Sequence, residues 1–126
     1  ASNISYVYDS LNRVTTTTQI LSAIPYTLSY NYYAANNQTR VTYPSGKVVD
    51  YTYDVHDRMD LIKVGGTTLT DYDYDPLDRR TSKTFSTGPQ QQAQYSFDMA
   101  NQLLSLTNTV LPSTAISTYG YTYDNV

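Results

Sequence analysis

The chain has 126 residues and is rich in tyrosine, with 15 copies, while it contains no cysteine and no tryptophan. Tyrosine, threonine and valine favour β-strands, and the acidic residues are all aspartate, so the composition argues against a helical bundle. The absence of cysteine excludes disulfides and thiolate metal sites. The formal net charge of −3, with no concentrated basic cluster, argues against nucleic acid as a partner.

Two uncharged stretches, residues 14–39 and 99–123, are long enough to be tested as membrane spans. Both are interrupted by Thr, Ser, Asn, Gln and Pro, whereas a span needs about 20 predominantly apolar residues. No membrane span is therefore predicted. The first residues lack the basic and apolar regions of a signal peptide. Because the chain starts just before one motif and stops within another, we expect it to be a piece of a longer protein.

One short motif recurs along the chain: aromatic, any residue, aromatic, Asp, two variable residues, Asn or Asp, and usually Arg. The starts of its copies are 24, 21, 21, 23 and 26 residues apart, which predicts one repeated supersecondary unit. The regular copies are Tyr6-Val7-Tyr8-Asp9-Ser10-Leu11-Asn12-Arg13, Tyr51-Thr52-Tyr53-Asp54-Val55-His56-Asp57-Arg58 and Tyr72-Asp73-Tyr74-Asp75-Pro76-Leu77-Asp78-Arg79. Degenerate copies occupy residues 30–37 and 95–102, and residues 121–124 begin another.

The motif predicts a strand, a tight turn and a returning strand. Side chains alternate between the faces of a strand, so Tyr51 and Tyr53 share one face. The aspartate that follows can accept a hydrogen bond from the backbone two residues on and so begin a type I turn. The later Asn or Asp occupies the place where such a turn needs a left-handed residue. This predicts positive φ angles at Asn12, Asn36, Asp57, Asp78 and Asn101.

A second turn closes each period. Tyr43-Pro44-Ser45-Gly46 carries Pro and Gly at favoured turn positions, and Gly65-Gly66 is typical of a two-residue hairpin. Thr87-Gly88-Pro89 and Leu111-Pro112-Ser113 occupy equivalent places. The predicted fold is all-β, an antiparallel meander of ten or eleven strands in which β-hairpins repeat. No linker interrupts it, so residues 1–126 are predicted to form a single array of about five repeats.

The repeated unit resembles the YD-repeat, or Rhs-repeat, family over essentially the whole chain, although Asn or Asp stands where that family usually has Gly. The resemblance implies a section of a spiralling β-shell that encloses a C-terminal toxin or other polypeptide, as in bacterial polymorphic toxins, insecticidal toxin complexes and teneurins. It further implies secretion or display at the surface of a bacterial cell. The motif residues to which it assigns a structural role are Tyr6, Tyr8, Asp9, Asn12, Arg13, Tyr51, Tyr53, Asp54, Asp57, Arg58, Tyr72, Tyr74, Asp75, Asp78, Arg79, Tyr95, Phe97, Asp98 and Asn101.

No catalytic, metal or cofactor site is predicted. The run Asp71, Asp73, Asp75 opens like a calcium loop, but Pro76 stands where such loops need Gly. We expect these aspartates to be neutralised across the hairpin by Arg79, Arg80 and Lys83, with a weak cation site as the alternative. The only histidine, His56, falls at a turn. An enzyme is therefore not expected.

The tyrosine ladder has two interpretations. Tyr can form a core or the interior wall of a sheet, and we favour this; exposed rings that stack against sugars would make a carbohydrate-binding or adhesive module. A chain of this length can bury roughly two thirds of its unfolded surface if it closes on itself. The expected partners are flanking repeats of the parent chain, the enclosed polypeptide and, as alternatives, a glycan or a second copy joined through open edge strands.

Overall fold

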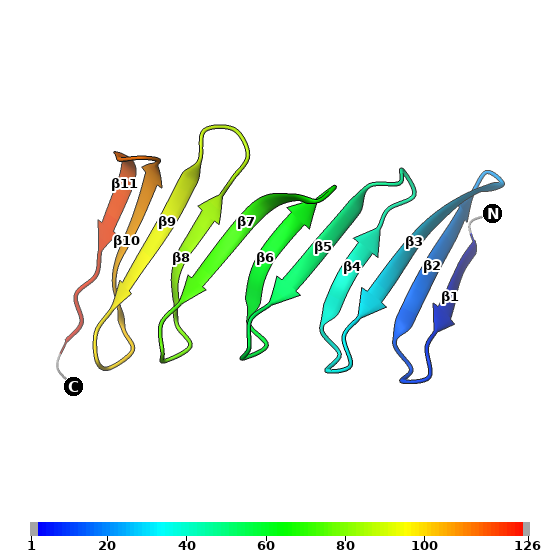
Figure 1. Ribbon diagram of the computed structural model, residues 1–126, viewed down its shortest axis with the longest axis horizontal. Helices are drawn as coiled ribbons and strands as arrows, with labels where there is room; N and C mark the ends of the chain where they lie inside the picture. Colours follow the sequence, from blue (N-terminus) through cyan, green and yellow to red (C-terminus); the bar gives the residue numbers. More distant parts are fainter. Residues whose placement is uncertain (1–2, 125–126) are drawn as a thin grey trace. The chain divides into compact units, whose positions relative to one another are not determined.

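The protein is described by a computed structural model that covers residues 3–124, and its regular secondary structure there consists of eleven β-strands. The strands are β1 (Asn3–Tyr8), β2 (Val14–Leu21), β3 (Ile24–Tyr32), β4 (Gln38–Thr42), β5 (Val48–Tyr53), β6 (Met59–Val64), β7 (Thr67–Tyr74), β8 (Arg80–Phe85), β9 (Gln91–Phe97), β10 (Leu103–Val110) and β11 (Thr114–Gly120) (Figure 1). The predicted all-β class and antiparallel meander are confirmed.

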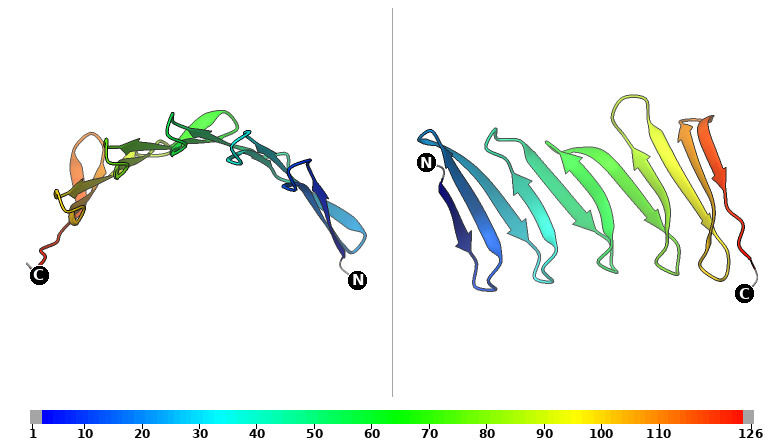
Figure 2. Two further views of the ribbon diagram at one scale, coloured as in Figure 1. Left: turned by 90° about the horizontal axis from the view of Figure 1, so that it is seen from below. Right: turned by 180° about the vertical axis from the view of Figure 1, so that it is seen from behind.

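The strands belong to two compact units, one up to Thr67 and one from Thr68 onward. In the first unit β1 to β6 pair antiparallel in chain order, and in the second β7 to β11 do the same. Each unit is a single layer of strands, as the edge-on view in Figure 2 shows. Neighbouring hairpins, and not a second layer, must therefore supply most of the packing.

A single layer leaves much of the chain in contact with solvent. The accessible surface is 8577 Å², whereas a globular protein of 14.2 kDa would expose roughly 6,800 Å². The only hydrophobic side chains buried in the described part of the chain are Val41 and Val49. The tyrosines therefore do not form a closed core, which was one form of the favoured interpretation: Tyr6 and Tyr8 are each 52% exposed. Period-2 alternation places the rings on one face, but nothing in the layer covers that face.

The turn within each repeat has the predicted geometry. The five predicted left-handed residues have positive φ angles: Asn12 60°, Asn36 71°, Asp57 60°, Asp78 63° and Asn101 65°. The register of the strands shifts beside every one of these turns, as expected for a type I turn followed by a bulge. The turn chemistry that was inferred from sequence is therefore confirmed.

We expect Asn12→Gly to be neutral or to raise the free energy of unfolding by up to about 1 kcal/mol, because Gly has no Cβ penalty at positive φ. The β-branched variant Asn12→Val should instead lower it by roughly 1–2 kcal/mol. Denaturant unfolding of both variants measures the difference. Equal stabilities would show that the left-handed conformation is not maintained in solution.

The turns at the opposite ends of the strands are more varied. Gly46, Gly65, Gly66 and Gly88 have positive φ angles, as their predicted turns require. The connection between β2 and β3 was not predicted, because its two residues, Ser22 and Ala23, lack the usual turn signal. Their φ angles are nevertheless 49° and 66°, and Leu21 pairs directly with Ile24. This is a two-residue hairpin built from residues that tolerate its backbone poorly.

Replacing Ser22-Ala23 by Asn-Gly should therefore stabilise the first unit, by about 1 kcal/mol or more, since Asn and Gly adopt positive φ more readily. The thermal unfolding midpoint is the measurement. The same Asn-Gly pair placed at Val55-His56, in the middle of a turn that needs positive φ only at Asp57, is the matched control and should give no such gain.

Candidate functional site

The recurring geometry of the repeat begins with a clip, a set of hydrogen bonds between its aspartate and its arginine. In the first copy, Asp9 Oδ1 accepts hydrogen bonds from the backbone N–H groups of Leu11 at 2.9 Å and Arg13 at 3.0 Å. Asp9 Oδ2 accepts from Arg13 Nε at 2.7 Å, and Arg13 Nη2 lies 2.7 Å from the same oxygen. One carboxylate therefore caps the turn through Oδ1 and holds two nitrogens of the arginine through Oδ2.

The same clip occurs in two further copies. Asp54 accepts from the backbone of His56 and Arg58, and from Arg58 Nε at 2.7 Å. Asp75 accepts from the backbone of Leu77 and Arg79, and from Arg79 Nε at 2.7 Å. Because each aspartate has the same set of donors, the repeated motif forms one repeated structure.

These hydrogen bonds lower the pKa of the clip aspartates. The guanidinium of Arg58, together with backbone N–H groups, lowers the pKa of Asp54 from 3.8 to about 2. The backbone N–H of Arg13 has the largest effect in lowering the pKa of Asp9. At Asp75 partial burial raises the pKa, but the hydrogen bonds from Arg79 outweigh it and the net shift is downward. All three carboxylates are therefore held in the charged form.

Stability should consequently depend on pH in the acid range. Since the pKa of Asp54 is about 2 in the folded chain and 3.8 in the reference state, the unfolded chain binds more protons between these values. The stabilisation is present above about pH 4 and is lost as the pH falls toward 2. Urea unfolding as a function of pH measures this loss. Asp54→Asn should be less stable at pH 7 and should show a shallower loss toward acid; an unchanged slope would contradict the assignment.

The clip arginine also reaches the next repeat in the chain. Arg13 Nη1 donates to the carbonyl oxygen of Tyr33 at 2.8 Å, and its guanidinium lies 4.8 Å from the ring centre of Tyr32. Arg79 does the same further along, donating to the carbonyl oxygen of Asp98 at 2.8 Å and lying 4.9 Å from the ring centre of Phe97. One arginine therefore joins its own turn to the following turn.

The second aromatic residue of the motif makes a contact in the reverse direction. Tyr32 Oη donates to the carbonyl oxygen of Val14 at 2.7 Å, Tyr53 Oη to that of Gln38 at 2.8 Å and Tyr123 Oη to that of Leu103 at 2.9 Å. In each case the acceptor is the residue that follows the arginine position of the preceding copy. Burial first, and then the neighbouring tyrosines, raise the pKa of Tyr53, so its hydroxyl keeps the proton that it donates.

The ladder between strands of adjacent repeats ends before the turns. Toward the turns that carry the clips, the last residue pair between β2 and β3 is Thr16 with Ser29. Between β10 and β11 the last pair at this end is Ser105 with Gly120. The strands separate beyond these pairs, and the tyrosine hydroxyls bind carbonyl groups that the ladder leaves without a partner. Sequence reasoning missed this contact; its only signal was the preference for Tyr over Phe at the second aromatic position.

The degenerate copies keep part of this arrangement. Tyr33 replaces the aspartate, and the turn retains only backbone bonds, with Tyr33 N–H donating to Asn37 O at 2.8 Å. Asn37, at the arginine position, donates to Asp57 Oδ1 at 3.3 Å and so still reaches the following turn. Asp98 accepts from the N–H of Gln102, and Phe97 has no hydroxyl to donate. The remaining predicted aromatics, Tyr51, Tyr72, Tyr74 and Tyr95, are half-buried on their strands.

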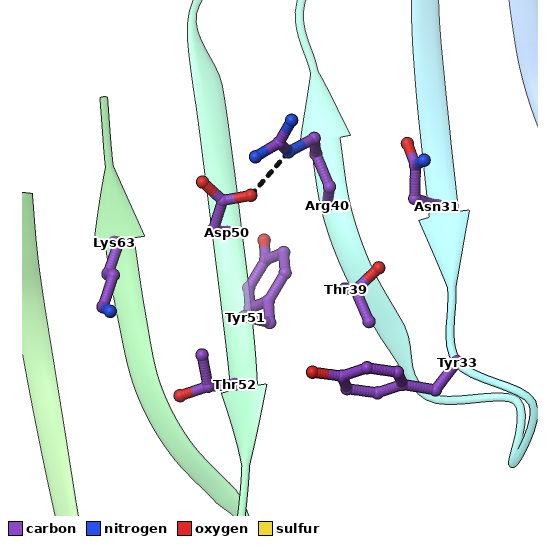
Figure 3. Close-up of a pocket in the computed structure, with 8 residues that line it drawn as sticks. All are labelled: Asn31, Tyr33, Thr39, Arg40, Asp50, Tyr51, Thr52 and Lys63. Carbon is purple, nitrogen blue, oxygen red and sulfur yellow. Dashed lines mark hydrogen bonds and ion pairs between the residues drawn. The ribbon is translucent and has the colours of Figure 1, made fainter. Parts of the chain in front are cut away.

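The two faces of the first unit carry different rows of directly paired residues. One row is apolar and joins Tyr30, Val41, Val49 and Val64 across β3 to β6. The adjacent row on the other face is polar and joins Asn31, Arg40, Asp50 and Lys63. Arg40 Nε donates to Asp50 Oδ1 at 2.6 Å, and the two side chains face each other across β4 and β5 in Figure 3.

The polar row lines an open groove of about 370 Å³, which also includes Tyr33, Thr39, Tyr51 and Thr52 (Figure 3). The groove offers a guanidinium, an ammonium, a carboxamide and an aromatic ring. Asp50 is engaged by Arg40, and this pairing raises the pKa of Arg40 through the hydrogen bond and the opposite charge. Such a surface can bind a polar ligand, but it brings together no nucleophile and base.

The other candidate groups from the sequence lie apart from one another. His56 is exposed at its turn, and within residues 3–124 no group of three or more His, Asp or Glu side chains is placed to hold a metal ion. Asp73 Oδ2 accepts from Ser82 Oγ at 2.6 Å. The expectation that Arg80 and Lys83 neutralise the Asp71–Asp73 face is wrong: Lys83 pairs with Tyr72 and Arg80 with Tyr74, because a bulge shifts the register. Within residues 3–124 no helix is long and apolar enough to span a membrane.

Comparison with known proteins identifies the repeat. The sequence model of the RHS repeat matches residues 32–68, which include the complete copy with the Asp54–Arg58 clip. This segment of the chain is an Rhs repeat. The resemblance to the YD-repeat, or Rhs-repeat, family is thereby confirmed. No curated protein matches the chain in sequence.

Solved structures share the fold of this chain. The crystal structure of TcdB2-TccC3-Cdc42 superposes with a TM-score of 0.73 at 21% identity, covering 98% of this chain. The Tc holotoxin pore of Photorhabdus luminescens with the TccC3-D651A mutation gives a TM-score of 0.55 at 14% identity over 95% of this chain. The chain spans 8% of the length of each of those chains. At these identities the likeness establishes the fold.

Proposed function

We propose that the chain is a section of wall in a hollow Rhs-repeat shell that encloses a C-terminal polypeptide of the same protein. The observation that carries this proposal is that hydrogen bonds join each repeat to both of its neighbours, and we call these bonds the fastening contacts. Arg13 and Arg79 donate to carbonyl groups of the following repeat. Tyr32, Tyr53 and Tyr123 donate to carbonyl groups of the preceding repeat. Contacts of this kind extend a sheet from repeat to repeat without closing it around a core, and this is what a thin wall requires.

The proposal extends to the organisation and location of the protein. A single array over residues 1–126, continued by further repeats of the parent chain, would allow the fastening to run on beyond both ends. A secreted bacterial protein without enzymatic activity or cofactor in this segment is the form we propose. The matches to Tc toxin structures, which share the fold, support this assignment.

Limited proteolysis of the complete parent protein tests the shell. Sequences C-terminal to the array should resist protease in the intact protein and become cleavable after Tyr53→Ala, which opens a fastening contact. Leu77→Ala, at an exposed turn position, is the matched control and should leave protection unchanged. Cleavage of the C-terminal sequences in the intact protein as fast as in the free peptide would overturn the proposal.

A second function, binding of glycans, is favoured by the groove around Arg40 and Asp50, where Tyr33 is 50% exposed and could stack against a sugar ring. A glycan array with the chain and with Tyr33→Ala tests it. Signals that disappear in the variant would support sugar binding at this groove, and signals that are absent or unchanged would exclude it.

A further inference from the structure

One face of the second unit carries a row in which aromatic and cationic side chains alternate. The row consists of Phe85, Lys83, Tyr72, Arg80 and Tyr95, on strands β7, β8 and β9. Lys83 Nζ lies 4.5 Å from the ring centre of Phe85 and 5.6 Å from that of Tyr72. The Arg80 guanidinium lies 5.8 Å from the ring centre of Tyr72 and 4.8 Å from that of Tyr95. We call these five residues the cation–aromatic row.

Within the described part of the second unit, the two cations of the row differ from the clip arginines in forming no ion pair with a carboxylate. Arg79 is paired with Asp75 at 2.7 Å, whereas neither Arg80 nor Lys83 forms an ion pair with any described residue of the unit. The register explains this. Tyr72 stands opposite Lys83, so both lie on the aromatic face, while Asp73 stands opposite Ser82 on the other face.

This separation of charge is notable because the second unit is acidic overall. From Thr68 onward it contains six aspartates and three basic residues, yet Asp71 and Asp73 project from the face opposite to the row and Asp75, Asp78 and Asp98 lie at turns. The aromatic face is therefore locally positive on an acidic unit. A cation that lies against aromatic rings is partly shielded from water and binds a carboxylate better than a fully hydrated one.

We propose that the cation–aromatic row is a docking surface for an extended acidic polypeptide segment that carries carboxylates beside apolar or aromatic side chains. The rings provide apolar contact, and the two cations provide charge. Because the cations stand opposite Tyr72 and Tyr74, which are two positions apart on β7, their Cα atoms are roughly 7 Å apart. A polypeptide in an extended β conformation places residues i and i+2 on one side at the same distance, roughly 7 Å. The surrounding aspartates would repel a long polyanion, and for this reason a peptide is preferred.

The proposal goes beyond the shell and does not depend on it, because the chain alone should bind. The probe is a fluorescein-labelled peptide with glutamates at positions i and i+2 and with leucine and tyrosine on either side of them, titrated by fluorescence anisotropy at low salt. Arg80→Gln and Lys83→Gln should each weaken binding roughly three- to ten-fold, and Lys83→Arg, which keeps the charge, should retain it. Lys47→Gln, an equal charge change at an exposed turn of the first unit, should alter the affinity less than twofold.

Three results would overturn the proposal. One is equal affinity for the glutamate peptide and the same peptide with glutamines. Another is an effect of Lys47→Gln as large as that of the row variants. The third is binding of heparin or single-stranded DNA without binding of the peptide, which would assign the row to polyanions. Thermal unfolding of each variant verifies folding, and affinity that falls with added salt in the unmodified chain provides a measure that requires no substitution.

Discussion

Val49→Asp is expected to unfold the first unit, at a cost of at least about 3 kcal/mol, because it places an unpaired carboxylate at one of its few buried positions. Val49 is 9% exposed and stands between Val41 and Val64 in the apolar row. A fold with a small buried core has little other hydrophobic stabilisation to compensate for the loss. Val49→Ala should cost less, about 2 kcal/mol, since it removes two methyl groups without adding charge.

Val55→Asp provides the matched control for this prediction. Val55 occupies a turn and is 95% exposed, so the same chemical change there should alter the free energy of unfolding by no more than about 0.5 kcal/mol. Circular dichroism and urea unfolding of the three variants give the comparison. Similar stabilities for Val49→Asp and Val55→Asp would show that the apolar row is not a core in solution.

Tyr53→Ala should have the second largest effect, roughly 2–3 kcal/mol, because it removes a half-buried ring and the hydrogen bond to the carbonyl of Gln38. Tyr53→Phe keeps the ring and isolates the hydroxyl, and about 1 kcal/mol should be lost. The adjacent Thr52→Ser retains the hydroxyl that donates to Asp60 and should cost much less than 1 kcal/mol. Urea unfolding separates the three.

The fifth repeat allows the reciprocal experiment. Phe97 lies where the other copies place the donating tyrosine, and the equivalent carbonyl in the preceding copy belongs to Arg80. Phe97→Tyr should therefore raise the free energy of unfolding by about 0.5–1 kcal/mol. A stabilising Phe97→Tyr together with a destabilising Tyr53→Phe would establish the hydroxyl as the fastening group. A Phe97→Tyr variant that is destabilised, beside a destabilised Tyr53→Phe, would refute the equivalence of the repeats.

The strands and turns could be predicted because they depend on residues close in sequence. Aspartate at the start of the turn and Asn12 or Asp57 near its end determine the backbone within eight residues, and their φ angles agree with that reasoning. The contacts of Tyr32 with Val14 and of Arg13 with Tyr33 could not be predicted. They join residues about 20 positions apart and depend on where the ladder between two strands ends.

Three other features escaped prediction for different physical reasons. The face on which Arg80 lies follows from a one-residue bulge, and a bulge reverses the alternation that is counted from the sequence. The exposure of Tyr6 and Tyr8 was missed because alternation shows which residues share a face but does not show whether another layer covers it. The groove of the polar row likewise depends on cross-strand register, which places Asn31, Arg40, Asp50 and Lys63 in line.

The contacts between strands also bear on how such a chain can change over generations. Within each unit, strands make extensive contact only with the strands next to them in the sequence. Duplicating or deleting one whole copy of 21 to 26 residues therefore leaves the contacts inside all other copies as they were, provided that the new neighbours keep a tyrosine and an arginine at the joining positions. A gene of this kind can lengthen or shorten its product by unequal recombination without redesigning any packing, so the number of repeats can evolve independently of the sequence of each repeat.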